Sequence, residues 1–254
     1  MQDKQDIYVE ISGNGFPLVL VHGFLGSSSM WLNQKIFFEK NFKVITPNLP
    51  GFGLSQNVTP AKSIEEMANT IIEYLNKNEI NKFNLLGHSM GGMIVQEMAN
   101  KVGDKIEKLI CFATGAIGEM PDRFETIDQS RDRFKKLGKK STAISIAKTW
   151  FVEGDQAKFF YLCEEAGNQA NELAIDQALI AMKNWNGLKK LINIKNKTLI
   201  IWGDKDRSYN FFQVDTLNKN ISNSRLEVMT GCAHNAHLEN PELFNSILNE
   251  FLIK

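Results

Sequence analysis

The sequence predicts an α/β fold, in which a mostly parallel central sheet carries helices on both faces. Short apolar runs alternate along the chain with longer segments of helical period, which is the pattern of strand–helix–strand units. Most runs are rich in Val, Ile, Leu and Phe with little polar alternation, as expected for strands buried on both faces. The predicted strands cover residues 7–11, 17–21, 42–46, 83–86, 109–113, 198–202 and 226–229.

The helices between these strands have recognisable starts. Ser63 is followed three positions later by Glu66, a capping box that begins a helix with apolar side chains at helical spacing. A second helix is expected over residues 90–100. The last helix covers residues 241–253 and has Pro241 in its first turn, where the missing N–H of proline is tolerated.

One long stretch interrupts the alternation of strands and helices. From about residue 115 to residue 191 the pattern is helical throughout and contains no strand-like run. The expected helices there are one marked by Phe124, Ile127, Phe134 and Leu137, one from Ser141 or Thr142 to about Phe151, and two around residues 157–166 and 172–185. We therefore predict one core, residues 1–114 and 192–254, with residues 115–191 inserted as a helical lid over the strand ends.

Composition argues against several classes of partner. Lys and Arg total 29, as do Asp and Glu, so the formal charge is zero and there is no basic stripe for nucleic acid. No run of about 18 apolar residues suggests a membrane span, and the polar start of the chain lacks the apolar stretch of a signal peptide. The three cysteines are far apart, without metal-site spacing. We expect a cytoplasmic protein that binds a small molecule and needs no metal or cofactor.

The sharpest motif is Gly87-His88-Ser89-Met90-Gly91, which lies between a predicted strand and a predicted helix. This G-x-S-x-G pattern is typical of a nucleophile elbow, in which a strained turn lifts the serine hydroxyl above the end of the sheet. The helix that follows places positive potential where an oxyanion would form. Ser89 is therefore the candidate nucleophile.

A serine hydroxyl needs a base, and the chain has only four histidines. His22 directly follows a strand, where this architecture draws an oxyanion-hole N–H, and His88 is held within the elbow. His234 and His237 remain, both after the last strand. His234 is favoured because it follows that strand within a short loop, although His237 stays open as an alternative.

The base in turn needs an acid that fixes its tautomer. The strand over residues 198–202 ends in Gly203-Asp204-Lys205-Asp206, which brings two aspartates to the edge of the sheet where the elbow lies. Asp206 is favoured because it lies further into the loop, whereas Asp204 is expected to form the turn. The chain order is then Ser…Asp…His.

These motifs together resemble the α/β-hydrolase superfamily over nearly the whole chain. The resemblance rests on His22-Gly23, Asn48-Leu49-Pro50-Gly51-Phe52-Gly53-Leu54-Ser55, the elbow, Gly203-Asp204-Lys205-Asp206 and His234…His237-Leu238-Glu239-Asn240-Pro241. It implies that Asp206 is the acid, that His234 is the base, and that the backbone N–H groups of Phe24 and Met90 form the oxyanion hole. Two positions depart from the family pattern: Asn48 stands where Asp is usual, and Ala233 precedes the base where Gly is usual.

Within that superfamily, the insertion is similar to that of the 3-oxoadipate enol-lactonase-like branch, at residues 150–151 and 181–185. This similarity implies hydrolysis of a small carboxylic ester or lactone through an acyl-enzyme. Candidate pocket residues are Trp31, His88, Trp150, Phe151 and Trp185.

Three alternatives remain open at this stage. Two are enzymes with the same triad: a C–C bond hydrolase, and a synthase that eliminates pyruvate. That synthase positions an anionic substrate with arginines, whereas Arg123, Arg131 and Arg133 of this chain are expected on one solvated helix. The third is a small-ligand receptor that does not catalyse a reaction.

Overall fold

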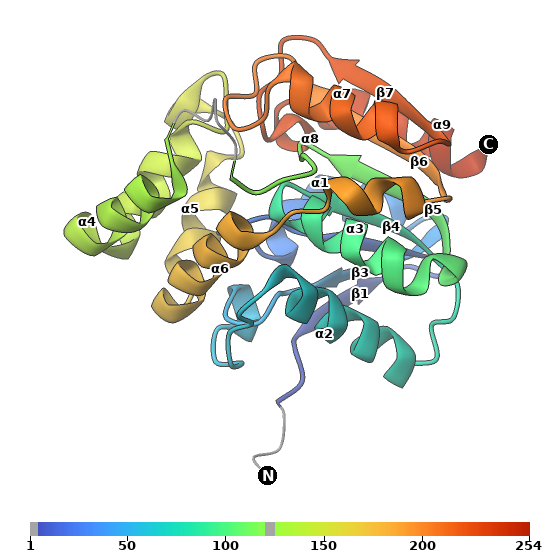
Figure 1. Ribbon diagram of the computed structural model, residues 1–254, viewed down its shortest axis with the longest axis horizontal. Helices are drawn as coiled ribbons and strands as arrows, with labels where there is room; N and C mark the ends of the chain where they lie inside the picture. Colours follow the sequence, from blue (N-terminus) through green and yellow to red (C-terminus); the bar gives the residue numbers. More distant parts are fainter. Residues whose placement is uncertain (1–4, 120–124) are drawn as a thin grey trace.

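The computed structural model describes residues 5–119 and 125–254. It contains a seven-stranded sheet in the order β1-β3-β2-β4-β5-β6-β7, parallel except for β1, which pairs antiparallel with β3 (Figure 1). The strands are β1 (Val9–Ser12), β2 (Phe16–Val21), β3 (Phe42–Pro47), β4 (Phe83–His88), β5 (Ile106–Phe112), β6 (Lys197–Gly203) and β7 (Ser224–Met229). The predicted fold class is confirmed, with every predicted strand present.

The boundaries shift most at β5, which begins at Ile106, three residues before the predicted start. Glu107 and Lys108 are the second and third residues of this strand, and Glu107 is exposed. These polar residues do not look like part of a strand in an apolar pattern. They belong to β5 because its parallel pairing with β4 already begins at Ile106, opposite Phe83.

Helices cover both faces of the sheet, because successive strand residues point to opposite sides. Helices α1 (Leu32–Phe38) and α9 (Pro241–Ile253) pack on the face that carries Leu18, Leu20 and Ile110. The opposite face, with Val19, Leu85 and Cys111, packs against α2 (Ile64–Lys77), α3 (Met90–Val102) and α7 (Phe211–Asn220). The apolar character of both faces explains why the strand sequences show little alternation.

The predicted helix starts are found at the expected residues. The Ser63 side chain accepts a hydrogen bond from the Glu66 N–H at the start of α2, and Pro241 opens α9. The Glu66 carboxylate accepts from the N–H of Lys62 rather than from that of Ser63, so the reciprocal half of the capping box is displaced by one residue.

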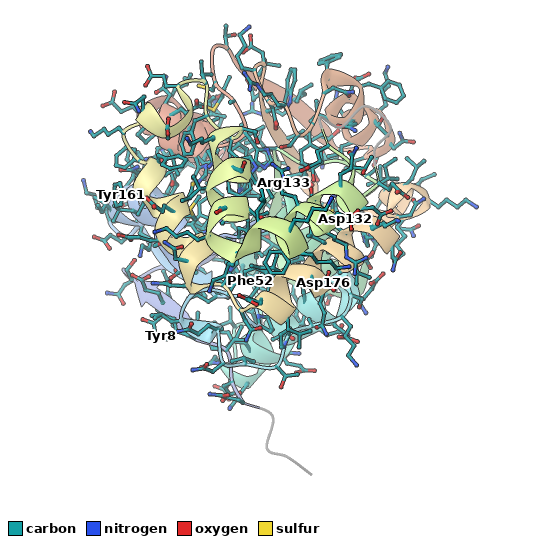
Figure 2. The ribbon with its side chains drawn as sticks, turned by 90° about the vertical axis from the view of Figure 1, so that its left-hand side faces the viewer. Tyr8, Phe52, Asp132, Arg133, Tyr161 and Asp176 are labelled. Atoms are coloured by element: carbon teal, nitrogen blue, oxygen red, sulfur yellow. The ribbon has the colours of Figure 1, made fainter. Side chains whose placement is uncertain are left out.

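The insertion (residues 115–191) carries α4 (Ile127–Lys148), α5 (Phe160–Gln169) and α6 (Glu172–Asn184) between β5 and β6. Gly138 is non-helical, with a φ of 74°, and divides α4 into two helical segments, as predicted for the residues on either side of 138–141. Phe124, which marked the first of them, lies outside the described residues. Figure 2 views the molecule from the side of the insertion, with α4 toward the viewer.

One backbone contact closes the insertion at its base, and another ties it to the core. The N–H of Gly118 donates to the carbonyl of Trp185 at 3.0 Å, which joins the start of the insertion to its end. The N–H of Asn171 donates to the carbonyl of Gly51 at 2.8 Å, in the loop after β3. Within the two described ranges, no helix is long and apolar enough to cross a bilayer.

Candidate active site

The nucleophile elbow is formed where β4 meets α3. Ser89 has φ 56° and ψ −118°, a left-handed conformation that costs an L-residue about 1–3 kcal/mol and persists only where the surroundings impose it. Two glycines allow the turn to pack. A Cβ on Gly87 would lie 2.2 Å from the carbonyl oxygen of Gly91, and one on Gly91 would lie 2.4 Å from that of Val21. The motif therefore needs glycine at both places because backbone atoms occupy the space of a side chain.

Neighbouring strands fix the serine from both sides. The Ser89 N–H donates to the carbonyl of Phe112 at the end of β5, at 2.9 Å. The Ser89 carbonyl accepts from the Thr114 hydroxyl at 2.8 Å. The residue is only 9% exposed, so the hydroxyl of Ser89 lies in a largely enclosed place.

The predicted base and acid are in contact. His234 Nδ1 and Asp206 Oδ2 are 2.9 Å apart, and their side chains are 2% and 0% exposed. Asp206 Oδ1 accepts from the N–H groups of Ser208, at 2.7 Å, and Tyr209, at 3.2 Å. With Nδ1–H directed at the carboxylate, His234 keeps Nε2 free to act as a base.

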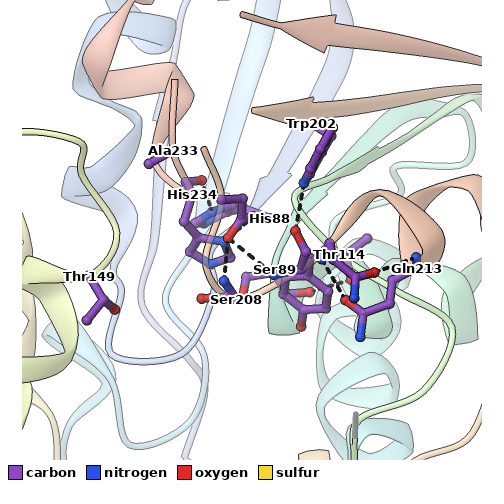
Figure 3. Close-up of polar contacts among 12 residues, drawn as sticks. His88, Ser89, Thr114, Thr149, Trp202, Ser208, Gln213, Ala233 and His234 are labelled. Carbon is purple, nitrogen blue, oxygen red and sulfur yellow. Dashed lines mark hydrogen bonds and ion pairs between the residues drawn. The ribbon is translucent and has the colours of Figure 1, made fainter. Parts of the chain in front are cut away.

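The three residues converge because each follows the carboxyl end of a strand. Ser89 follows β4, Asp206 follows β6, and His234 follows β7, and these strands share one parallel run of the sheet. Figure 3 shows Ser89, His88 and His234 gathered at that edge. Asp204 is directed elsewhere, since its Oδ1 accepts from the N–H of Gly231 at 2.7 Å and closes the turn.

The other three histidines are fully buried, and burial is the main reason that their pKa values fall. The pKa of His22 drops to about 4 and that of His237 to about 3, and the pKa of His88 lies well below its ordinary value. His22 Nε2 accepts from the N–H of Leu49 at 3.0 Å, so its proton is on Nδ1, 2.8 Å from the Gly23 carbonyl oxygen. His22 thus links two loops and has no nitrogen left to act as a base.

His237 packs as an aromatic ring. It lies 4.9 Å from the ring of Trp31 and 5.1 Å from that of His88. Its nearest polar neighbour is the backbone of Met30, which opposes the fall of its pKa, yet neither ring nitrogen makes a hydrogen bond of good geometry. The surroundings of His237 suit a neutral imidazole, whereas His234 has the carboxylate partner.

The predicted oxyanion donors flank the serine. Met90 is the first residue of α3, so its N–H has no partner within the helix. A Cβ on Gly23, the residue before Phe24, would lie 3.0 Å from the Ser89 Cβ, which shows how closely that turn approaches the elbow. Among the hydrogen bonds of the described residues, none is donated by the N–H of Phe24 or of Met90.

Two predicted pocket residues, Trp31 and Trp150, lie against histidine rings at the site, whereas Phe151 and Trp185 make their contacts elsewhere. Trp150 contacts the ring of His234, with centroids 5.9 Å apart, while Trp31 contacts the ring of His88 at 6.3 Å. Phe151 packs on Phe160 within the insertion. Trp185 donates its indole N–H to Glu97 on α3, at 2.8 Å, and this contact holds it at the base of the insertion.

Two neighbours of His234 are not among the predicted site residues. The ring of Tyr209 stacks on that of His234, with centroids 5.7 Å apart and an interplanar angle of 12°. Glu239 accepts hydrogen bonds from the loop that carries His234. Glu239 stands in the motif after His237, which could have pointed to it, whereas no sequence signal marks Tyr209.

The departures from the family pattern are accommodated locally. Asn48 is fully buried, and its Oδ1 accepts from the N–H of Ser28 at 2.9 Å, so the amide performs the loop packing. The described arginines of the insertion are paired: Arg131 with Asp176 at 2.7 Å, and Arg133 with Glu125. Arg123 lies outside the described residues.

Comparison with known proteins identifies the family. The model of the α/β-hydrolase fold family matches residues 17–161, which is more than half of the chain. This chain is a member of the α/β-hydrolase family. A curated relative, the AB hydrolase superfamily protein YisY of Bacillus subtilis, is 27% identical over 259 residues, covering 98% of this chain and 96% of that protein.

Solved structures agree with this assignment. The esterase EaEST from Exiguobacterium antarcticum superposes with a TM-score of 0.90 at 26% identity, covering 98% of this α/β-hydrolase and 96% of the esterase. The enol-lactonase from Burkholderia xenovorans has a TM-score of 0.87 at 20% identity, covering 98% and 96% of the two chains. At that lower identity the likeness to the enol-lactonase concerns the fold alone.

Proposed function

We propose that this α/β-hydrolase is a serine hydrolase that cleaves small carboxylic esters or lactones through an acyl-enzyme. The observation that carries the proposal is the buried pair of His234 and Asp206, 2.9 Å apart, on the same sheet edge as the strained Ser89. A buried carboxylate, an imidazole with one free nitrogen and an activated hydroxyl are the parts that acyl transfer needs.

The first half of the reaction forms the acyl-enzyme. Ser89 Oγ attacks the substrate carbonyl carbon while His234 Nε2 accepts the hydroxyl proton. The negative charge moves to the carbonyl oxygen, where the N–H groups of Phe24 and Met90 are placed to donate to it. The tetrahedral species then collapses, the C–O bond to the leaving group breaks, and His234 returns the proton to the departing alcohol.

The second half consumes water. His234 removes a proton from a water molecule that attacks the acyl carbon, and the Ser89 ester bond breaks as Ser89 regains its proton. A carboxylic acid leaves, so atoms and charge balance without a cofactor. In a lactone the departing alcohol stays joined to the acyl group, and one hydroxy acid is released.

The insertion is proposed to act as the lid and to form part of the pocket wall. Support comes from Trp150, which lies against His234, and from α6, which packs on the loop after β3 at the same end of the sheet. The choice of an ester as substrate is supported by the similarity to an esterase at 26% identity over nearly the whole chain.

The decisive experiment combines covalent labelling with an activity screen. A fluorophosphonate should label the wild type at Ser89 and leave Ser89→Ala unlabelled. Ser89→Ala should also lose about 10⁶-fold of its turnover of p-nitrophenyl esters or lactones while keeping its thermal unfolding midpoint, since only the contributions of the oxyanion hole and of binding remain. Labelling at another residue, or full activity of Ser89→Ala, would refute the acyl-enzyme. Turnover of vinylogous diketones, without turnover of esters, would favour a C–C hydrolase instead.

A further inference from the structure

Three consecutive backbone groups around the base are held by three different parts of the chain. The Ala233 N–H donates to Glu239 Oε2 at 2.5 Å. The His234 carbonyl oxygen is 3.1 Å from His88 Nε2, which ties it to the elbow. The Asn235 N–H donates to the carbonyl of Trp150 at 3.0 Å. Figure 3 shows Ala233 and His234 at the start of this loop, with His88 alongside.

Glu239 uses its second oxygen on the insertion. Oε1 accepts from the N–H of Val152, 87 positions earlier in the chain, at 2.7 Å. One carboxylate therefore joins the insertion to the loop that carries His234. A further link runs parallel to it, since Asn235 Nδ2 lies 3.3 Å from Cys163 Sγ on α5. The loop of the base is therefore bonded to residues 150–152 through Glu239 and through the Asn235 N–H.

The position of Glu239 is costly for a charged group. It ends α8 (Ala236–Glu239) and is half-buried, which raises its pKa, and the nearby charges of Asp206 and Glu153 raise it further. The two N–H donors, from Val152 and Ala233, oppose this rise. A carboxylate in such a place depends on those two bonds, because a buried acceptor without donors loses its hydration without compensation.

We propose that Glu239 is a positioning residue that couples the insertion to the catalytic base. The carboxylate sets the backbone before His234 only while residues 150–152 are docked against it, so the base is in place when the insertion covers the site. The inference rests on the proposed function. It extends it by naming the group through which closure of the insertion is transmitted to the triad.

The kinetic test compares Glu239→Ala, Glu239→Gln and a matched control, Glu242→Gln. The control lies three residues further on, is exposed, and stands in the first turn of α9. Glu239→Ala removes both acceptor oxygens, and displacement of the base should lower kcat about 10- to 100-fold. KM should stay within about twofold, since the group makes no substrate contact. Glu239→Gln keeps one acceptor oxygen and should lose less, and Glu242→Gln should match the wild type.

Hydrogen exchange tests the coupling without using activity. In Glu239→Ala, the amides of residues 150–152 and 233–235 should both exchange about 10-fold faster or more, because each segment loses its bond to the carboxylate and only the Asn235 N–H to Trp150 bond still joins them. Faster exchange in residues 233–235 with residues 150–152 unchanged would overturn the coupling. An unchanged kcat in Glu239→Ala would overturn the positioning role.

The two proposals can fail separately. A wild type that neither labels with a fluorophosphonate nor cleaves esters refutes the proposed function, while the exchange experiment still measures whether Glu239 joins the two segments. A wild type that labels normally, with Glu239→Ala equal to it in kcat and in exchange, refutes the role of Glu239 alone. The thermal unfolding midpoint of Glu239→Ala should stay above the assay temperature, and Glu239→Gln provides the second reading.

Discussion

The elbow and the insertion each contain a glycine with a different purpose. At Gly91 a side chain would collide with backbone oxygens of β2 and the residue after it, 2.4 and 2.6 Å away. At Gly138 a side chain would meet nothing within 4 Å, and only the φ of 74° favours glycine. In the core the main chain itself leaves no room, whereas in the insertion a kink is open to solvent.

The same contrast extends to the side chains around each glycine. The core strands bury their residues on both faces, and the triad is attached to strand ends whose register the sheet determines. The insertion buries apolar side chains such as Ile146 and Leu179 in the same cluster as the core, and the bond from Trp185 to Glu97 adds a polar contact. The proposed triad is therefore placed by strand register, whereas the insertion, which we propose shapes the pocket, depends on side-chain packing and has more freedom to vary.

The largest expected effect breaks the triad in the core. Asp206→Asn should lower kcat about 10⁴-fold because the base loses its orientation, and His234→Ala should lower it about 10⁶-fold because the base is lost altogether. Asp204→Asn is the matched control. The Asp204 carboxylate accepts from the Gly231 N–H and lies 3.5 Å from Lys205 Nζ, so this variant should cost less than about 10-fold. A steep loss in Asp204→Asn with a mild one in Asp206→Asn would reverse the assignment of the acid.

The next prediction compares the loss of stability when each of the two glycines is replaced by alanine. Gly91→Ala should lower the free energy of unfolding by about 3 kcal/mol, since backbone atoms must move to admit the methyl group. Gly138→Ala should cost about 1 kcal/mol, the penalty of a left-handed backbone alone. Denaturant unfolding of both variants measures the difference. Equal losses would show that the insertion is as tightly packed as the elbow.

The buried histidines make the core sensitive to acid. The pKa of His237 is about 3 in the folded chain and 6.5 in the unfolded chain. Between these two pH values the imidazole is protonated in the unfolded chain but not in the folded chain. Stability is therefore complete above pH 6.5 and falls by about 1.4 kcal/mol per pH unit for this residue as the pH drops toward 3.

His237→Phe tests that contribution, because it replaces the imidazole with a ring that cannot titrate. The variant should show a shallower loss of unfolding free energy between pH 6 and pH 4, by about 1.4 kcal/mol per unit. Unfolding curves at pH 7.5 provide the baseline for both proteins. A slope identical to that of the wild type would mean that His237 binds its proton equally in the folded and unfolded chain.

The smallest expected effect separates two tryptophans of the insertion. Trp150→Phe should change the ratio of kcat/KM for short and long acyl esters several-fold, about 1 kcal/mol, because Trp150 lies against His234. Trp185→Phe should leave that ratio unchanged and lower the unfolding midpoint, since the buried Glu97 loses a donor while Lys190 remains. A shift in the ratio for Trp185→Phe alone would place the pocket at the base of the insertion.

The sequence by itself determined the fold class, the order of strands and helices, and the place of the elbow. These follow from local signals: apolar runs without alternation, the Ser63 cap, and glycines around Ser89 that a sharp turn requires. It also ranked Asp206 above Asp204 and His234 above His237 as triad members. The structure joins Asp206 and His234 and gives the other two residues different surroundings.

Only the tertiary structure decided which distant groups surround the base. The contacts of Tyr209, Glu239 and Trp150 with the His234 loop bring together residues from three segments that no local pattern relates. The sequence also cannot tell that Trp150 contacts His234 and Trp185 contacts Glu97, because both are buried aromatic residues in helical sequence. Contacts between distant side chains depend on how helices and strands pack against one another. The sequence pattern shows the periodicity of each element but not which other elements it packs against.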